Sequence, residues 1–426
     1  MVQQGGNSDQ TSEKDFLIKP PAVSLPKGGG AIKGIGEKFT ANPVTGSGSL
    51  AIPIAISPGR SGFGPQLSLS YDSGAGNGPF GLGWSLSQPS IARKTDKGLP
   101  RYRDDEESDV FILSGAEDLV PSEEPVQNVE VYGKHYQIAI YRPRVEGLFA
   151  RIERWAEASS FENVFWRSIS RDNVTTWYGR SAESRIADPA DRSRIYQWLI
   201  CQSHDDKGNV IDYRYAGDNL GELDRESVWE SNRASEQHLA YRYPKEIYYG
   251  NKTSYFPDLA AAGNWLVLPE EDYLFRVVFD YGDPAANPPY TPGSPSSVLG
   301  TRPFERSDVF SSHRAGFDIR CHRLCRRVLM YHCFEELAPE PVLVHATEFD
   351  YYHPDATLLN NPEAGGYTCL RAATHRSYER VNDHYHDRAL PPVEFEYSQA
   401  KVDSTARSIA AEQLANLPVG TQGPGY

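Results

Sequence analysis

The sequence predicts an all-β fold: a large antiparallel sheet assembly of many hairpins, with a disordered N-terminus and little helix. The 36 Gly and 31 Pro of the 426 residues fit many short strands and turns better than long helices. Apolar side chains alternate with smaller or polar ones in repeated short runs, which is the period of a half-buried strand. With 12% aromatic and 23% charged residues, most of the chain is expected to fold.

The N-terminal part changes character near residue 50. Residues 1–24 are mostly polar and without periodicity, so we predict a disordered lead there. Alternation begins with residues 50–56 and returns at 67–71, which predicts two half-buried strands. Pro53 lies inside the first of these strands. Because proline has no amide hydrogen to donate, its presence predicts an edge position.

Two β-hairpins are predicted in the middle of the chain. The first joins residues 165–170 to 174–178, and the second joins 196–204 to 210–215. The second has the stronger turn signal, Asp205-Asp206-Lys207-Gly208-Asn209, because Asp, Gly and Asn readily take up turn conformations.

The C-terminal half continues the strand pattern. Residues 273–281 make the clearest aromatic-faced strand, and 343–351 and 393–397 add two more. Helical patterning is scarce, and its best candidate is Ser404–Asn416, which Pro418 and Gly420 would end. The Pro-rich stretch 283–297 predicts a surface loop that divides the sheet region, although one sheet assembly can span both sides of it.

Composition limits the kinds of partner. The formal net charge of −14 and the pI near 5.3 argue against nucleic-acid binding, because phosphate recognition needs a basic stripe. A local basic run is interleaved with apolar residues, so we interpret it as one face of a strand pair. Its members are Arg320, Arg323, Arg326 and Arg327.

The N-terminus and the cysteines bear on the compartment. Residues 1–15 lack the pattern of a secretory signal, and no run is long enough for a membrane-spanning helix. We expect a soluble chain made in the cytoplasm, with no direct membrane insertion, that leaves the cell by another route. Free, mostly buried thiols are expected at the five cysteines: Cys201, Cys321, Cys325, Cys333 and Cys369.

A series of motifs in a fixed order resembles the SpvB family, which is named for a Salmonella virulence plasmid protein and also forms the N-terminus of B-type proteins of insecticidal toxin complexes. The motifs are LPKGGGAIKGIGEKF at 25–39, LAIPIAISPGR at 50–60, LSLSYDSGAGNGPFGLGWSLSQPSIARKT at 67–95, YRPRVEGLFARIERW at 141–155, YQWLI at 196–200, LFRVVFDYGD at 274–283, FDIRCHRLCRRVLMYH at 317–332 and LPPVEFEY at 390–397. The hairpin at 205–209, followed by Tyr213 and Tyr215, also resembles one Tyr-Asp repeat of the RHS kind.

This resemblance implies a structural role. In the family's toxin complexes, B-type and C-type proteins together form a hollow β shell around a toxic segment, and a β-propeller docks the shell on the pore-forming A component. The implied partners are therefore the C-type and A-type components and the rest of the B-type chain. The implied location is extracellular, as part of the complex. The resemblance implies neither catalysis nor a cofactor for this region.

The resemblance also implies a division of the chain. We expect a lead at 1–24, a β domain at 25–398 with a possible subdivision near 283–297, and a linker or helix at 399–426. The sequence ends about where the propeller would begin, and it lacks the polyproline linker and ADP-ribosyltransferase domain of the Salmonella relative. An isolated N-terminal module is therefore expected.

Two motifs offer weak signals for small ligands. Gly76-Asn77-Gly78-Pro79-Phe80-Gly81 matches GxGxxG, but Pro79 removes a donor and no helix is predicted to follow, so we interpret it as a tight connection near Trp84. The acidic stretch 104–107 with Asp109 has carboxylates for calcium, but it lacks the spacing of an EF-hand and is more typical of a solvated turn.

Two clusters of potential metal ligands are also open to a plainer interpretation. His384 and His386 share one face if extended, beside Asp383 and Asp387, yet a polar loop is the simpler prediction. Zinc binding and core packing are the alternatives for a second cluster, of which core packing is preferred because the spacing does not fit a zinc site. It comprises Cys321, His322, Cys325, His332 and Cys333.

Catalytic motifs are weak. Glu394-x-Glu396 resembles the paired glutamates of ADP-ribosyltransferases, but strand alternation places both on a solvent face. HExxH, GxSxG and Walker motifs do not occur in the sequence, so no catalytic, cofactor-binding or metal-ligating residue is predicted. Two alternatives to a shell module stay open: a β-rich glycoside hydrolase, and a carbohydrate-binding module that would stack sugars on Trp155, Trp166, Trp177 or Trp265.

Overall fold

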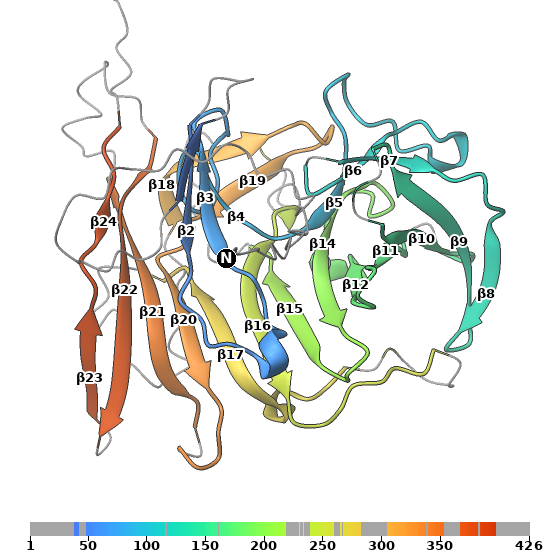
Figure 1. The fold of residues 1–426 in the computed structure, drawn as a ribbon. Coiled ribbons are helices and arrows are strands. Elements are labelled where there is room, and N and C mark those ends of the chain that lie inside the picture. The colour runs from blue at the N-terminus through green and yellow to red at the C-terminus, as the bar shows by residue number, and fades with distance from the viewer. Residues whose placement is uncertain are drawn as a thin grey trace, which may run out of the picture.

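In a computed structural model, the strands of the chain pair into three antiparallel sheets (Figure 1). The helices among the described residues are short 3₁₀ turns, and none of them has the length and apolar character needed to cross a membrane. These turns are η1 (Arg60–Gly62), η2 (Asp104–Glu106), η3 (Ala182–Ser184) and η6 (Glu270–Asp272). The structure describes residues 38–41 and 48–397, apart from 116, 146, 148, 161, 219–229, 231–232, 234–238, 260–264, 266, 283–304, 338–339, 353–366 and 382–383.

The first sheet has the strand order β1-β2-β3-β4. Its members are β1 (Lys38–Ala41), β2 (Gly48–Pro53), β3 (Ser68–Asp72) and β4 (Trp84–Leu86). The predicted edge position of Pro53 is wrong, because β2 lies between β1 and β3. Pro53 is the last residue of β2, where the missing amide hydrogen of proline disturbs the strand ladder least. Among the described residues, the pairing of β2 with β1 reaches only to Ala51, two residues before Pro53.

The second sheet begins as a closed ring, at the right of Figure 1. The ring runs β5-β6-β7-β9-β10-β11-β12-β14, and it closes because β14 pairs with β12 near one end and with β5 near the other. Its strands are β5 (Ser90–Arg93), β6 (Phe111–Leu113), β7 (Glu117–Pro121), β9 (Lys134–Pro143), β10 (Arg151–Glu157), β11 (Val164–Ile169), β12 (Thr175–Tyr178) and β14 (Ile195–His204). The short strands β8 (Gln127–Val131) and β13 (Arg185–Ala187) extend the rims on β9 and β14.

Alternation along these strands fills the ring with apolar side chains. Every strand of the ring contributes at least one fully or nearly buried residue to a single cluster. Trp166 and Trp198 lie at its centre with ring centroids 5.9 Å apart, and Phe111 packs against both. The ring is therefore a packed core with no open channel through this cluster. Its members are Ile91, Phe111, Leu119, Tyr141, Ile152, Val164, Trp166, Tyr178, Ile195, Trp198 and Ile200.

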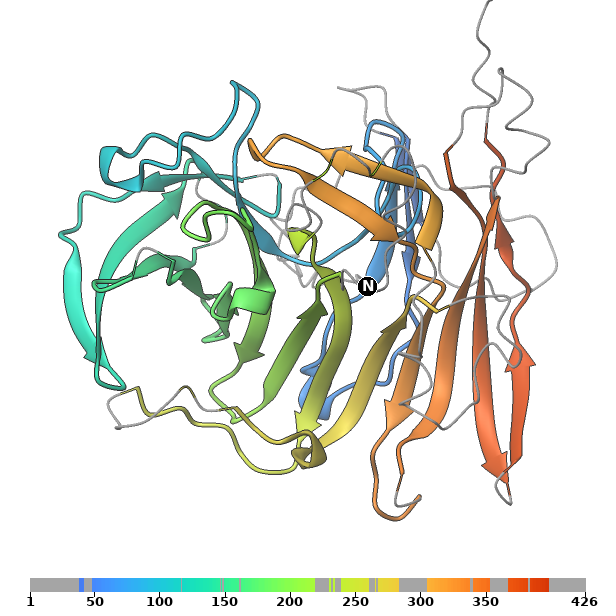
Figure 2. The same cartoon turned by 180° about the vertical axis from the view of Figure 1, so that it is seen from behind.

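Beyond β14 the same sheet continues as an open, curved wall (Figure 2). Its order is β15-β16-β17-β20-β21-β22-β23, and β24 also pairs with β22. Its strands are β15 (Val210–Ala216), β16 (Tyr243–Asn251), β17 (Tyr273–Asp280), β20 (Arg327–His332), β21 (Val342–Tyr352), β22 (Cys369–Val381), β23 (His384–Ala389) and β24 (Val393–Glu394). A separate ribbon pairs β18 (Glu305–Ser312) with β19 (Ile319–Arg323).

The N-terminal sheet covers one face of this wall. A large apolar cluster joins Ile52 and Leu69 of the first sheet to Val277, Met330 and Phe349 of β17, β20 and β21. Because side chains of successive strand residues point to opposite faces, the odd-numbered residues from Phe275 to Tyr281 make this contact, whereas Tyr273 packs in a separate cluster with Tyr248. The aromatic-faced strand predicted at 273–281 is thus β17 of the wall, with its aromatic face packed against the N-terminal sheet.

Most predicted strands are confirmed. Both hairpins pair as expected, β11 with β12 and β14 with β15, and 343–351 lies within β21. The predicted strand 393–397 is shorter than expected, since only Val393–Glu394 form β24. The lead at 1–24, the Pro-rich loop 283–297 and the helix Ser404–Asn416 lie outside the described residues.

The turn of the second hairpin depends on glycine. Gly208 has a φ of +82°, a conformation that a side chain disfavours by about 1–2 kcal/mol. We therefore expect Gly208→Ala to lower the free energy of unfolding in urea by about that amount. Gly76→Ala is the control, because no atom lies within 4 Å of a Cβ built there. Equal effects of both substitutions would contradict a role for the left-handed turn.

Candidate functional site

The glycine-rich loop 76–81 binds a guanidinium group of the protein itself. Arg306 Nη1 donates to the Gly78 carbonyl oxygen at 2.6 Å, and Arg306 Nη2 donates to Asn77 Oδ1 at 2.9 Å. The loop thus presents acceptor oxygens to a cation, the opposite polarity from a phosphate-binding loop. The prediction of a tight connection near Trp84 is confirmed, because the Gly83 and Trp84 amides bond back to the loop.

The acidic stretch at Asp104–Asp109 is also occupied by arginine. The guanidinium of Arg93, which is 2% exposed, pairs with Asp104 at 2.5 Å and with Asp109 at 2.7 Å. Burial alone would raise the pKa of Asp104, but hydrogen bonds and charge from Arg93 and Arg154 hold that pKa below its usual value. The solvated turn predicted here is therefore wrong for Asp104 and Asp109, although residues 105–107 are exposed.

The cysteine and histidine cluster divides between separate environments. Cys321 and Cys325 are fully buried free thiols in the core, as the core-packing interpretation predicts. Burial raises the pKa of both thiols, the opposite of what a reactive thiolate needs. No group of three or more His, Cys, Asp or Glu side chains that could hold a metal ion occurs in the described part of the chain.

The arginine run does not form one face of a strand pair, so that prediction is wrong. Arg320 and Arg323 differ by an odd number of positions along β19 and so point to opposite faces, and β19 pairs with β18 and not with β20. All four arginines are at most 9% exposed. Arg320 pairs with Glu230, Arg323 with Asp218 and Arg327 with Asp280, so these arginines bind acidic residues from other elements.

The aromatic platform suggested for sugar binding is absent at three of its four positions. Trp155, Trp166 and Trp177 are at most 2% exposed, and Trp265 is half-buried against Trp177 with ring centroids 5.0 Å apart. Their rings pack against other aromatic side chains, and the guanidinium of Arg167 lies over the rings of Trp155 and Trp177. These tryptophans stabilise the ring and its outer face, and three of them have no free face for a sugar.

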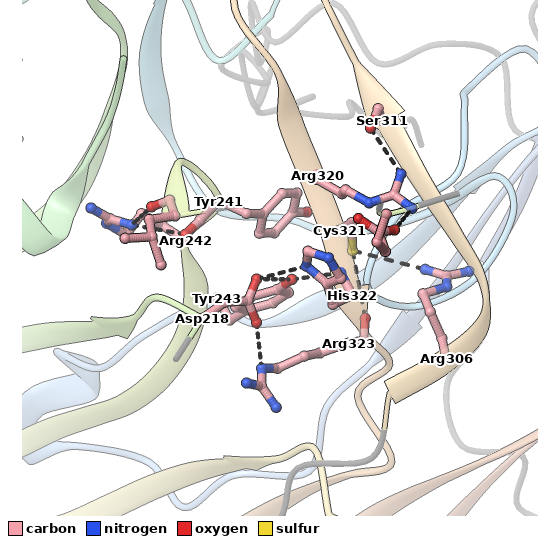
Figure 3. Close-up of polar contacts among 12 residues, drawn as sticks. Asp218, Tyr241, Arg242, Tyr243, Arg306, Ser311, Arg320, Cys321, His322 and Arg323 are labelled. Atoms are coloured by element: carbon pink, nitrogen blue, oxygen red, sulfur yellow. Dashed lines mark hydrogen bonds and ion pairs between the residues drawn. The ribbon is translucent and has the colours of Figure 1, made fainter. Parts of the chain in front are cut away.

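A buried polar cluster lies where the ribbon β18–β19 meets the start of β16 (Figure 3). Asp218 stands at its centre with a fully buried side chain. Tyr243 Oη donates to Asp218 Oδ2 at 3.1 Å, Arg323 Nε donates to Oδ1 at 2.6 Å, and His322 Nδ1 lies 3.1 Å from Oδ2. The His322 amide in turn donates to Tyr243 Oη at 2.9 Å, so one carboxylate ties the ribbon to the wall.

Sequence inspection missed both centres, Arg93 and Asp218. Arg93 lies within the motif at 67–95 but gives no sign there of its burial, and Asp218 lies outside the motifs, with 104 positions between it and His322. A single buried charge carries no local signal, because its burial depends on which distant strands pack around it. Covariation between such distant pairs would be the signal to look for.

The open edge of the wall is formed by β23 and β24. His384, His386, Asp387, Glu394 and Glu396 are exposed there, which confirms the solvent-facing position predicted for both glutamates. The polar loop predicted around His384 and His386 is wrong, since both belong to β23, while Asp383 lies outside the described residues.

A β-bulge interrupts this edge. Ala389 pairs with Arg376 and Val393 pairs with Ala373, so four steps on the edge match three steps on β22. Pro391 and Pro392 lie in the extra length. Because the Leu390 amide donates to the His375 carbonyl oxygen, the alternate main-chain groups of Tyr385, Asp387 and Ala389 point away from β22. Among the described residues, β22 is the one strand paired with β23.

A ladder of alternating charges crosses the wall on the face away from the N-terminal sheet and ends at this edge. Asp280 pairs with Arg327, Arg327 lies opposite Glu348, and Arg376 bonds both Glu348 and Asp387. The exposed fraction of these side chains rises in strand order, 3%, 11%, 28%, 30% and 44%. The ladder therefore ends in an exposed acidic group on the edge strand.

The chain matches the family model described as Salmonella virulence plasmid 65kDa B protein over residues 42–334. It is 37% identical over 352 residues to the mono(ADP-ribosyl)transferase SpvB of Salmonella choleraesuis strain SC-B67, an alignment that covers 79% of this chain and 54% of the relative. Relatives of the same name from Salmonella typhimurium and Salmonella dublin are 36% identical with the same coverage. The chain thus spans about half the length of the curated relatives it matches.

Solved structures share the fold. The crystal structure of TcdB2-TccC3 matches with a TM-score of 0.72 and 32% identity, over 89% of this chain and 17% of that one. The N-terminal domain of the effector protein SpvB from Salmonella typhimurium strain LT2 matches with a TM-score of 0.65 and 34% identity, over 77% and 98%. The Photorhabdus luminescens Tc holotoxin pore matches with a TM-score of 0.72 and 32% identity, over 91% and 17%.

Proposed function

Because the chain belongs to the SpvB family, we propose that it is a non-catalytic wall module of a bacterial toxin complex, forming part of a hollow β shell that encloses and helps deliver a toxic effector. The observation that carries this proposal is the continuous antiparallel sheet from the closed ring to the open edge at β23. One end of the sheet is sealed, and the other presents strand groups that are unpaired among the described residues, to which further strands can be added. The proposed setting is extracellular, in the assembled complex.

The buried charges support a structural role. Each centre described above is paired inside the protein: Arg93 with carboxylates, Arg306 with the glycine-rich loop, and Asp218 with donors from three residues. A catalytic acid, base or nucleophile needs access to a substrate and a suitable pKa. The name mono(ADP-ribosyl)transferase refers to the whole of each curated relative, whereas this chain aligns with 54% of each one. We therefore assign the transferase activity of those relatives to parts outside this chain.

The proposed partners are a C-type component, an A-type component and the remainder of a B-type chain. Solved structures with this fold include TcdB2-TccC3 and a Tc holotoxin pore, which supports partners of these classes. The test is co-purification of this chain with the remainder of a B-type protein and a C-type protein, followed by size-exclusion chromatography and limited proteolysis. A single protease-resistant particle is the expected result, and a chain that stays monomeric and separate would overturn the proposal.

The edge gives this test a sharper form. Ala389→Pro removes an outward amide donor without touching the bonds to β22, and Asp387→Lys reverses the last charge of the ladder. Each variant loses one hydrogen bond or one charge pair at the edge. We therefore expect it to associate roughly two- to tenfold more weakly with the C-type protein and the remainder of the B-type chain, as measured by titration.

Asp350→Lys is the matched control for Asp387→Lys. Both carboxylates are exposed and pair with an arginine of β22, but Asp350 lies within the sheet on β21. Association is expected to be unchanged in the control. Equal weakening by both reversals would show that net charge, and not the edge, controls assembly.

A further inference from the structure

Three histidines lie on one face of three neighbouring strands. His332 is the last residue of β20. His345 of β21 pairs with Met330 of β20. His375 of β22 pairs with Thr347 of β21, which lies two residues after His345. Directly paired residues and residues two apart share a face of a sheet, so the three imidazoles face the N-terminal sheet. They stand where the apolar core around Met330 gives way to polar side chains.

Two of these histidines hold the segment that begins at Pro53, the last residue of β2. We call residues 53–57 the strap. His375 Nε2 lies 2.9 Å from the Pro53 carbonyl oxygen, and His332 Nε2 lies 2.7 Å from Ser57 Oγ. Between them, the Ala55 amide donates to Thr347 Oγ1 at 3.3 Å. The strap carries Ile54 and Ile56 into the core, so these contacts fasten the N-terminal sheet to the wall.

The third histidine acts on the other two by charge. His345 bonds Ser377 through Nδ1, at 3.1 Å from Ser377 Oγ. Burial lowers the pKa of all three histidines below the usual value. The hydrogen bond to the Pro53 carbonyl oxygen offsets part of this effect on the pKa of His375, and proximity to His345 lowers the pKa of His332 and His375 further. Protonation of any one of them therefore disfavours protonation of its neighbour in the closed arrangement.

Among the residues that the structure describes, few charged groups face this patch. Glu379 on β22 and His384, His386 and Arg388 on β23 share its face, where Arg388 is opposite Ser377 and His386 is opposite Glu379, and all are exposed toward the outer edge. Arg60 follows the strap and is exposed. The rings of Phe275 and Phe334 pack against His332 and offer no counter-charge.

We propose that His332, His345 and His375 form an acid-sensitive latch, which holds the strap and the N-terminal sheet against the wall at neutral pH and releases them when the histidines are protonated. The latch is a property of the chain itself. It gives the wall, if the function proposed above holds, a part that moves when the complex enters an acidic compartment.

The direction follows from proton linkage. An opened strap exposes the imidazoles, whose pKa then returns to about 6.5, above the lowered pKa of the closed state. The open state therefore binds more protons in the range between these values, and acid favours it. The latch is at full strength above the free-imidazole pKa and weakens as pH falls through that value toward the lowered ones.

Hydrogen exchange of the full chain measures the latch directly. Peptides covering residues 48–57 are followed by mass spectrometry at pH 7.5 and pH 5.0, and the rates are corrected for the intrinsic effect of pH. We expect protection of the strap to fall at least fivefold at pH 5.0, while peptides from the ring strands β10 and β11 keep their protection. Unchanged protection of the strap at both values would overturn the proposal.

His345→Gln separates charge from contact. This residue bonds Ser377 and not the strap, so the variant keeps the two strap contacts while removing the charge that acts on both. In this variant, the fall in strap protection between pH 7.5 and pH 5.0 is expected to be at most half of the wild-type fall, on a logarithmic scale. An undiminished fall would overturn the proposal. His386→Gln, on the exposed edge, is the control and should behave as the wild type. If His345→Gln does not fold, His375→Gln takes its place. Because it removes a strap contact as well as a charge, protection of the strap is expected to be lower already at pH 7.5, and its fall at pH 5.0 is expected to shrink.

The outcome is independent of the assembly test, because it is measured on the isolated chain. A latch without assembly, or assembly without a latch, would each refute one proposal and leave the other standing.

Discussion

Replacing Trp198 by alanine is expected to lower the free energy of unfolding by about 3–5 kcal/mol, because the indole fills the centre of the closed ring. Trp198 is fully buried, and its Nε1 donates to the Val164 carbonyl oxygen at 2.7 Å. Its ring packs against Phe111 and Trp166, with centroids 5.7 and 5.9 Å away. Alanine would leave a cavity between strands that are distant in sequence and an acceptor without its donor.

Urea unfolding followed by far-UV circular dichroism measures this loss. The control is Phe256→Ala, since Phe256 is 63% exposed and a truncation at the surface should cost less than about 0.5 kcal/mol. A Trp198→Ala variant within about 1 kcal/mol of the wild type would contradict a single packed core in the ring.

Removing the carboxylate of Asp218 is the second change with a large expected effect. Asp218→Ala would leave Tyr243, His322 and Arg323 without their shared acceptor in a buried site, which costs about 3–5 kcal/mol. Asp218→Asn keeps the shape and one acceptor oxygen, so its cost should be smaller, though it still removes the negative charge of Asp218 that faces the guanidinium of Arg323.

Thermal and urea unfolding of both variants give the comparison. Asp350→Ala is the control, because Asp350 and Arg371 form an exposed pair that contributes about 1 kcal/mol or less. Limited proteolysis adds a local readout, since loss of the Asp218 bonds should free the ribbon β18–β19 first. Equal stability of Asp218→Ala and the wild type would show that the ribbon is held by its apolar contacts alone.

Local signals account for the parts of the fold that were predicted. Gly208 at φ +82° and Asn173 at φ +57° both lie in hairpin turns, and their residue types favour those conformations without help from distant strands. The strands that flank them follow from side-chain alternation, which is readable over a few residues. Both hairpins were therefore predictable within one or two residues of their observed ends.

The errors share one cause. Pro53, the arginines near residue 320 and the acidic stretch at 104 were each interpreted from immediate neighbours. The structure instead buries Arg320 and Arg323 on opposite faces of one strand and pairs them with Glu230 and Asp218. It also places Arg93 between two carboxylates that local reasoning assigned to solvent. Charge that looks solvated in sequence becomes internal when another layer covers it.

The sequence by itself determined the all-β class, the hairpins and the solvent position of Glu394 and Glu396, because turn chemistry and alternation act over a few residues. Tertiary structure alone decided the closure of the ring, in which β14 pairs with β5 more than 100 residues earlier, and the meeting of His332, His345 and His375 under the strap. The physical reason is that the register between distant strands depends on the packing of whole faces. That packing is a sum over many side chains and is not encoded at any single position.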